Sequence, residues 1–198
     1  MTKFVDFKAV FQLPTRSWTL EEYHAMIEAG ILTPEDRVEL IFGQIVETSP
    51  VGSAHSTAVK KITKLFHELL GEERVVIGVQ DPVTLLDDSE PEPDVFLARG
   101  VLEDYVDHHP HPADLMLIIE VSDSTLDKDR RAKKANYARA GITEYWVIDV
   151  FGRKLYRYTR PDQEERDYGQ LEELKADDTI SLLNFGEILV ADLLIDYR

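Results

Sequence analysis

The sequence contains no cysteine among its 198 residues. This absence excludes a disulfide scaffold, a thiol nucleophile and a cysteine-based zinc or iron–sulfur site. A chain of this length buries roughly 70% of its unfolded surface, which suffices for a hydrophobic core without cross-links. We therefore expect one domain over residues 1–198, with its core within about residues 20–195.

Long hydrophobic runs are also missing. The most apolar segment, residues 115–119, is far shorter than the roughly 20 residues of a membrane-spanning helix. The N-terminal segment MTKFVDFKAVFQLP lacks the apolar stretch and cleavage site of a secretory signal. We therefore expect a cytoplasmic protein with no membrane partner.

Positive charge is scarce. The chain has 22 lysines and arginines but 38 acidic residues, which gives a formal net charge of −16. This balance disfavours non-specific coating of nucleic acid, which depends on neutralising many phosphates. The exception is residues 128–139, which hold six basic residues and one acid. A site for an anionic partner should include this segment.

Three segments carry helical patterns. Thr19 and Glu22 have the spacing of a capping box, and an apolar stripe follows up to Gly30. From Ser53 or His55 to Leu70, apolar side chains recur at intervals of three and four. We also expect a helix over residues 127–140, closed by a glycine.

Most of the remaining apolar segments have strand character. Residues 115–122 are almost all apolar, which is typical of a central strand covered on both faces. The order of helices and strands predicts an α/β sandwich. The other expected elements are a hairpin at 38–46, strands at 74–79, 83–86, 94–98, 144–150 and 154–158, a polar loop at 161–170, an edge strand at 179–183 and a short helix within 188–194.

Two acids stand at strand ends. Asp94 follows a Pro-Glu-Pro turn, and Glu120 ends the most apolar strand, where an ionised carboxylate is costly without a partner. If the strands are neighbours, their side chains lie roughly 5 Å apart and can share a divalent cation. Oxygen ligands suit Mg²⁺ or Mn²⁺, which predicts metal-assisted hydrolysis. The alternative is a pair of ordinary ion-pair partners, which an acidic chain offers in number.

The basic helix supplies a partner for these acids. Asp129, Lys133 and Tyr137 share one helical face, and Arg130 and Lys134 lie on the adjacent one. Because the helix follows the central strand directly, Lys133 can lean back toward the strand end. There it would orient an attacking water and stabilise charge on a phosphate. The alternative is a solvated basic face.

Several segments together resemble a known family. PEPDVFLA and LMLIIEVSDSTLDKDRRAKKANYARAGITEYWVID, preceded by VELIFGQIVE and PVGSAH, are similar to the Uma-two family of restriction-endonuclease-like proteins, within the PD-(D/E)XK nuclease superfamily. The resemblance extends from about Leu20 to the terminal segment FGEILVADLL. It implies an αβββαβ core with a mixed sheet flanked by helices, an N-terminal hairpin and a C-terminal strand extension.

The resemblance also implies roles for particular residues. Asp94 and Glu120 would be the catalytic acids that bind Mg²⁺ or Mn²⁺. Where the superfamily has a lysine two residues after the second acid, this chain has Ser122, which shares the face of Glu120. In this family a helix lysine is thought to substitute, and Lys133 matches it, ahead of its neighbours at positions 128 and 134.

His55 and Glu39 match further family positions. His55 is either a proton shuttle or phosphate contact, or a capping group at a helix start. Glu39 is either another acid of the metal site or an ion-pair partner in the hairpin. Both belong to the expected catalytic set. The expected substrate-binding residues are Gln80, Ser122, Arg130, Lys134 and Tyr137.

The favoured function is a magnesium-dependent endonuclease acting on DNA. A homodimer would place two basic helices along one groove, and symmetric pairs are the commonest oligomers. A catalytically silent interaction module with the nuclease fold is the second hypothesis, favoured by the net charge and by Ser122. A phosphodiesterase for a smaller substrate is the third, because an acidic surface would matter less to it.

Overall fold

A computed structural model describes residues 15–71 and 74–196 of the chain. Its centre is a six-stranded mixed sheet with the order β3-β4-β5-β6-β7-β8, in which only β5 and β6 run parallel. The strands are β3 (Val75–Gly78), β4 (Val95–Arg99), β5 (Leu115–Ser122), β6 (Glu144–Asp149), β7 (Lys154–Asp162) and β8 (Asp167–Lys175). This mixed sheet with flanking helices confirms the predicted fold class.

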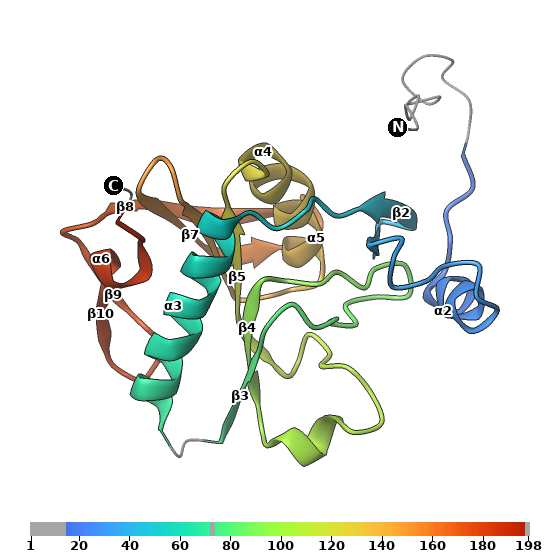
Figure 1. The fold of residues 1–198 in the computed structure, drawn as a ribbon, viewed down its shortest axis with the longest axis horizontal. Helices are drawn as coiled ribbons and strands as arrows, with labels where there is room; N and C mark the ends of the chain where they lie inside the picture. The colour runs from blue at the N-terminus through green and yellow to red at the C-terminus, as the bar shows by residue number, and fades with distance from the viewer. Residues whose placement is uncertain (1–14, 72–73, 197–198) are drawn as a thin grey trace.

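Smaller elements surround the sheet. Figure 1 shows α2 and β2 at one end of the molecule and β9, β10 and α6 at the other. The helices are α2 (Leu20–Glu28), α3 (Ser53–Leu70), η1 (Leu102–Tyr105), α4 (Leu126–Lys128), the π-helical turn η2 (Asp129–Lys133), α5 (Lys134–Arg139) and α6 (Val190–Leu193). The small strands are β1 (Val38–Ile41), β2 (Gln44–Glu47), β9 (Thr179–Ser181) and β10 (Glu187–Leu189).

The central strand β5 is buried on both faces, as its apolar sequence predicts. Leu117 and Ile119 join the core under α3, whereas Ile118 joins the core under α5. Alternate residues of a strand face opposite sides, so Glu120 and Ser122 lie on the α5 side. The sheet therefore presents the end of β5 to the helix that follows it.

The N-terminal helix and hairpin form as predicted. Thr19 Oγ1 accepts from the Glu22 backbone at 3.2 Å, and Glu22 accepts from the Thr19 backbone at 3.1 Å, which completes the capping box. Gly43 turns the hairpin with a φ of 68°, and a Cβ there would lie 2.6 Å from Ser17 Cβ. Only glycine therefore fits this turn. The helix predicted from Ser53 or His55 to Leu70 is α3, which begins at Ser53.

Five predictions were wrong in detail. Residues 83–86 form no strand; residues 83–85 are irregular, and Leu86 makes an isolated bridge with Ser89 across the turn at residues 87–88. Residues 161–170 belong largely to β7 and β8, because a solvated edge strand is as polar as a loop. The predicted edge strand at 179–183 pairs with β10 and not with the main sheet, and the segment 188–194 begins as β10 before α6. The predicted helix over 127–140 is interrupted by η2.

Candidate functional site

The two candidate metal-binding acids lie across from each other. Val95 of β4 pairs with Ile119 of β5, so Asp94 and Glu120, one residue further on, are opposed in this antiparallel pair. Both side chains are almost buried, with residue exposures of 8% for Asp94 and 3% for Glu120. Antiparallel pairing of the two strands thus brings together two acids 26 positions apart in the sequence.

Asp94 is fixed by partners from three elements. Its Oδ2 accepts from the Val121 backbone at 2.8 Å, and its Oδ1 contacts His55 Nε2 at 2.8 Å and accepts from Gln80 at 3.3 Å. Burial opposes the charge of Asp94, but the bond and attraction to His55 lower its pKa overall. Burial likewise opposes the charge of His55, but its bond to Asp94 raises its pKa overall. The pair therefore favours an aspartate facing an imidazolium.

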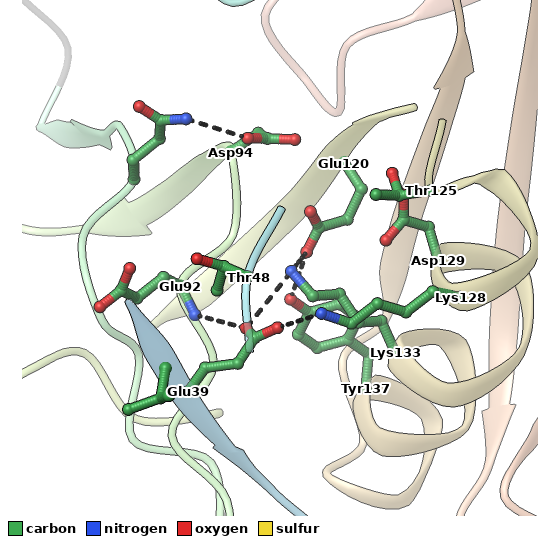
Figure 2. Close-up of polar contacts among 12 residues, drawn as sticks. Glu39, Thr48, Glu92, Asp94, Glu120, Thr125, Lys128, Asp129, Lys133 and Tyr137 are labelled. Carbon is green, nitrogen blue, oxygen red and sulfur yellow. Dashed lines mark hydrogen bonds and ion pairs between the residues drawn. The ribbon is translucent and has the colours of Figure 1, made fainter. Parts of the chain in front are cut away.

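Glu120 receives two donors on a single oxygen. Figure 2 shows Lys133 and Tyr137 converging on it, with distances to Oε1 of 2.8 Å and 2.7 Å. No described residue donates to Oε2, and this atom is not enclosed, so it opens onto the cleft. Burial raises the pKa of Glu120 well above its ordinary value, and Lys133 opposes that rise. Glu120 consequently has an oxygen available for a cation.

Lys133 bridges two carboxylates from distant parts of the chain. Its Nζ lies 2.8 Å from Glu120 and 3.4 Å from Glu39 Oε2, and Glu39 belongs to the hairpin strand β1. Burial alone would lower the pKa of Lys133, but Glu120 and Glu39 raise it overall. Lys133 is therefore a permanent cation and not a proton acceptor.

Glu39 is fully buried, with 0% exposure, and is held from three directions. Besides Lys133, its carboxylate accepts from Lys128 at 2.7 Å and from the Glu92 backbone at 3.2 Å (Figure 2). Burial would raise the pKa of Glu39, but Lys133 and Lys128 lower it overall. Glu39 thus acts here as the partner of two lysines, one of the two roles that the sequence left open.

The π-helical turn η2 positions Lys133. Asp129 accepts from Ser122 at 2.7 Å and from Thr125 at 2.5 Å, which ties the start of the turn to the end of β5. Such π-helical turns occur frequently at functional sites because they shift side chains relative to a regular helix. Ser122 therefore anchors the element that carries Lys133.

A cleft of about 530 Å³ opens over these residues. Lys128, Lys133 and Arg37 are the cations on its wall, against six carboxylates from Glu39, Glu92, Asp94, Glu120, Asp123 and Asp129. Burial and neighbouring acids also raise the pKa values of Glu92 and Asp129. Repulsion among these carboxylates would be relieved by a bound cation.

The predicted site residues divide into three groups. Those that line the cleft are Asp94, Glu120, Lys133, His55, Glu39 and Gln80. Ser122 and Tyr137 are buried behind it, with exposures of 1% and 0%. Arg130 and Lys134 are not on its wall, because Arg130 lies 3.8 Å above the Tyr156 ring and Lys134 pairs with Asp167 at 2.5 Å.

The cations of the basic segment 128–139 are paired within the chain, although Lys128 and Lys133 also line the cleft. Each of its six cations is held within the chain: Lys128 by Glu39, Arg130 by Tyr156 and Tyr158, Arg131 by Asp127, Lys133 by Glu120 and Glu39, Lys134 by Asp167 and Arg139 by Asp88. A charge count along the sequence cannot reveal this, because most of these partners come from other elements. Two other residues on the cleft wall, Glu92 and Arg37, were missed. Glu92 could have been found in the Pro-Glu-Pro motif, whereas no signal marks Arg37.

The donor set fits magnesium or manganese. Among residues 15–71 and 74–196, no group of three or more histidine or acidic side chains is arranged to hold a metal ion. Mg²⁺ often uses only one or two carboxylates and completes its octahedron with water and phosphate. Asp94 and Glu120 supply such oxygens, and Glu120 Oε2 faces the cleft. Within the same described ranges no helix is long and apolar enough to cross a membrane.

Comparisons with known proteins found a matching family and a similar fold. The model of the family Uma2, described as "Putative restriction endonuclease", matches residues 20–191. A crystal structure from Anabaena variabilis, described as a putative nuclease belonging to DUF820, superposes with a TM-score of 0.65 at 16% sequence identity. The match covers 88% of this chain and 96% of that one. No curated protein matches the chain.

Proposed function

The chain belongs to the Uma2 family, and on this basis we propose that it is a magnesium- or manganese-dependent endonuclease that hydrolyses phosphodiester bonds in DNA. One observation carries the proposal. Glu120 at the end of β5 lies opposite Asp94 and receives Lys133 from the following helix, all within one cleft. Two acids and a cation in one cleft are the groups that metal-assisted phosphodiester hydrolysis needs.

Asp94 and Glu120 would hold the metal ion, which when bound activates water and polarises the phosphate. Lys133 would orient the attacking water and stabilise the charge that develops on the phosphate. Because its raised pKa keeps it protonated, Lys133 serves as a hydrogen-bond donor and not as a general base.

Two further residues would act through others. His55 holds Asp94 Oδ1 and would orient that carboxylate toward the metal. Glu39 lies 3.4 Å from Lys133 and would keep the ammonium at the cleft. Both are positioning residues in this mechanism, and Gln80, which also contacts Asp94, would line the substrate path.

A first experiment combines calorimetry with plasmid cleavage. We expect millimolar or tighter binding of Mg²⁺ and Mn²⁺ by the wild type, loss of binding in Asp94→Asn and Glu120→Gln, and loss of cleavage in Lys133→Met. Lys134→Met is the matched control, because Lys134 lies outside the cleft, and it should cleave normally.

Absence of metal binding and of cleavage would favour a different function. The competing hypothesis is a catalytically silent interaction module, favoured by the neutralisation of the basic helix within the chain. A wild type that binds neither metal and leaves plasmid intact would support that module. Cleavage of small phosphodiesters but not of plasmid would favour a smaller substrate.

A further inference from the structure

Arg37 is the cation on the cleft wall that no carboxylate neutralises, among the residues that the structure describes. Lys128 and Lys133 are both held by Glu39. Arg37 is exposed, and within residues 15–71 and 74–196 the one partner of its side chain is the carbonyl oxygen of Ser49, 3.2 Å from Nη2. Its guanidinium therefore retains the capacity to bind an anion in two-pronged fashion.

The backbone holds Arg37 in an unusual conformation. Its φ is 50°, in the left-handed region that side chains other than glycine rarely adopt. The carbonyl of Arg37 accepts from the backbone and the hydroxyl of Thr48, at 2.8 Å and 3.1 Å. The base of the hairpin thus fixes this residue at the mouth of the cleft, and such strain clusters at functional sites.

Apolar side chains line the same cleft as Arg37. Ile27 at the end of α2 and Val51 before α3 are each 45% exposed, although both have large hydrophobic side chains. Leu32 and Pro34 from the segment between α2 and β1 also line the cleft. The cleft therefore combines an apolar wall and one free cation with the acids and lysines of the sheet end.

We propose that Arg37 and this apolar wall form a subsite for one unpaired nucleotide of the substrate strand. The guanidinium would contact the phosphate next to the scissile one, and the base or sugar would lie against Ile27 and Val51. This inference rests on the proposed function and specifies its substrate as single-stranded nucleic acid or an extruded nucleotide.

Size and charge both favour an unpaired nucleotide over a duplex. A volume of about 530 Å³ is that of a pocket for a small molecule and is too small to enclose a double helix. Duplex-binding proteins neutralise on the order of six to ten phosphates, whereas the cleft offers one cation free of carboxylates. Single strands also expose base faces, which duplexes hide by stacking.

The test measures binding of a fluorescent single-stranded oligonucleotide and of its duplex, at several salt concentrations. Calcium replaces magnesium, because it accepts the same oxygen ligands. The variant is Arg37→Gln. The control is Arg131→Gln, which removes an exposed arginine that pairs only with its helix neighbour Asp127, outside the cleft. Arg37→Gly serves as a second variant, because glycine accepts the positive φ and keeps the fold.

We expect the wild type to bind the single strand more tightly than the duplex. Both Arg37 variants should weaken that binding about tenfold and reduce the salt slope by about 0.7, the value for one phosphate contact on a single strand. Val51→Ser should weaken binding without changing the slope, and Arg131→Gln should change neither. Tighter duplex binding, or Arg37 variants that bind like the wild type, would overturn the proposal.

Failure of the subsite and failure of the proposed function are distinguishable. Plasmid cleavage by the wild type together with unchanged binding in the Arg37 variants leaves the nuclease and removes the subsite. Binding of single strands that depends on Arg37, without cleavage in magnesium, leaves the subsite and removes the nuclease.

Discussion

Single residues in this protein serve both stability and the candidate chemistry. Lys133 is 6% exposed and compensates Glu120 and Glu39 together. Removing one partner of a buried ion pair leaves an uncompensated charge, which is far more costly than replacing the whole pair. A substitution of Lys133 would therefore leave two buried carboxylates without this cation.

We predict that Lys133→Met lowers the free energy of unfolding by about 3 kcal/mol. The double variant Lys133→Met with Glu120→Gln should recover part of that loss, because the stranded charge of Glu120 is then absent. Urea denaturation of the wild type and the three variants closes the double-mutant cycle. Additive effects of the two substitutions would show that the pair is not coupled.

At the scale of elements, the end of β5 and the helix that follows it meet at the candidate site. Ser122 lies on the face of β5 that bears Glu120, and its hydroxyl contacts Asp129. A lysine at position 122 would therefore meet a carboxylate beside the cleft.

This arrangement predicts a rescue. Lys133→Met should abolish plasmid cleavage, and adding Ser122→Lys should restore at least about a tenth of the wild-type rate by returning a cation to the site. Adding Lys at the control position Thr57, on the exposed face of α3, should restore nothing. Equal rescue by both additions would indicate a general effect of charge.

A contact between α5 and the turn at Asp88 makes the free energy of unfolding depend on pH. Arg139 of α5 donates to both oxygens of Asp88, in the turn beside the hairpin, and these bonds lower the pKa of Asp88. A lowered pKa contributes stability above the unfolded value of about 3.9, and the contribution is lost as pH falls through the folded value. Because the Asp88 side chain is 35% exposed, solvent screening limits the effect.

We therefore predict that Asp88→Asn lowers the thermal midpoint near neutral pH and that the difference from wild type shrinks to zero in strong acid. Thermal denaturation at several pH values between about 7 and about 2 tests this. Asp127→Asn is the control, because its partner Arg131 is a helix neighbour at the surface. A difference that does not depend on pH would contradict the assignment.

At the scale of the whole molecule, the excess of acid is the dominant property. A net charge of −16 repels itself in the folded state, and the cleft concentrates six carboxylates of that excess. Salt screens the repulsion among all the charges of the chain. A divalent cation instead binds at one site and stabilises the native state by mass action.

We predict that about 10 mM MgCl₂ raises the thermal midpoint more than NaCl of equal ionic strength, because of binding to the native state. The additional rise of the thermal midpoint in MgCl₂ should disappear in Glu120→Gln. It should persist in Glu173→Gln, whose carboxylate lies on β8 away from the cleft. Identical curves in the two salts would exclude a specific cation site.

Much of the fold follows from the sequence because local signals agree with tertiary demands. The capping box at Thr19 predicted the start of a helix, and the apolar run of residues 115–122 predicted a central strand. Both elements formed. The strand predicted at 154–158 formed as the first half of β7, whereas the rest of β7 and all of β8 were missed because their outward side chains are polar. The π-helical turn was missed because Asp129, Lys133 and Tyr137 have ordinary helical spacing, and only their contacts with β5 shift the backbone.

The sequence by itself identified two candidate acids at strand ends and the basic segment that follows the second one, because residue identity and spacing are local properties. The tertiary structure alone decided which charges are left free. It neutralised the basic helix with acids from β1, β8 and the turn beside the hairpin, and it left Arg37 open at the cleft. The physical reason is that attraction between charges depends on their separation in space, and that separation exists only after the sheet has assembled.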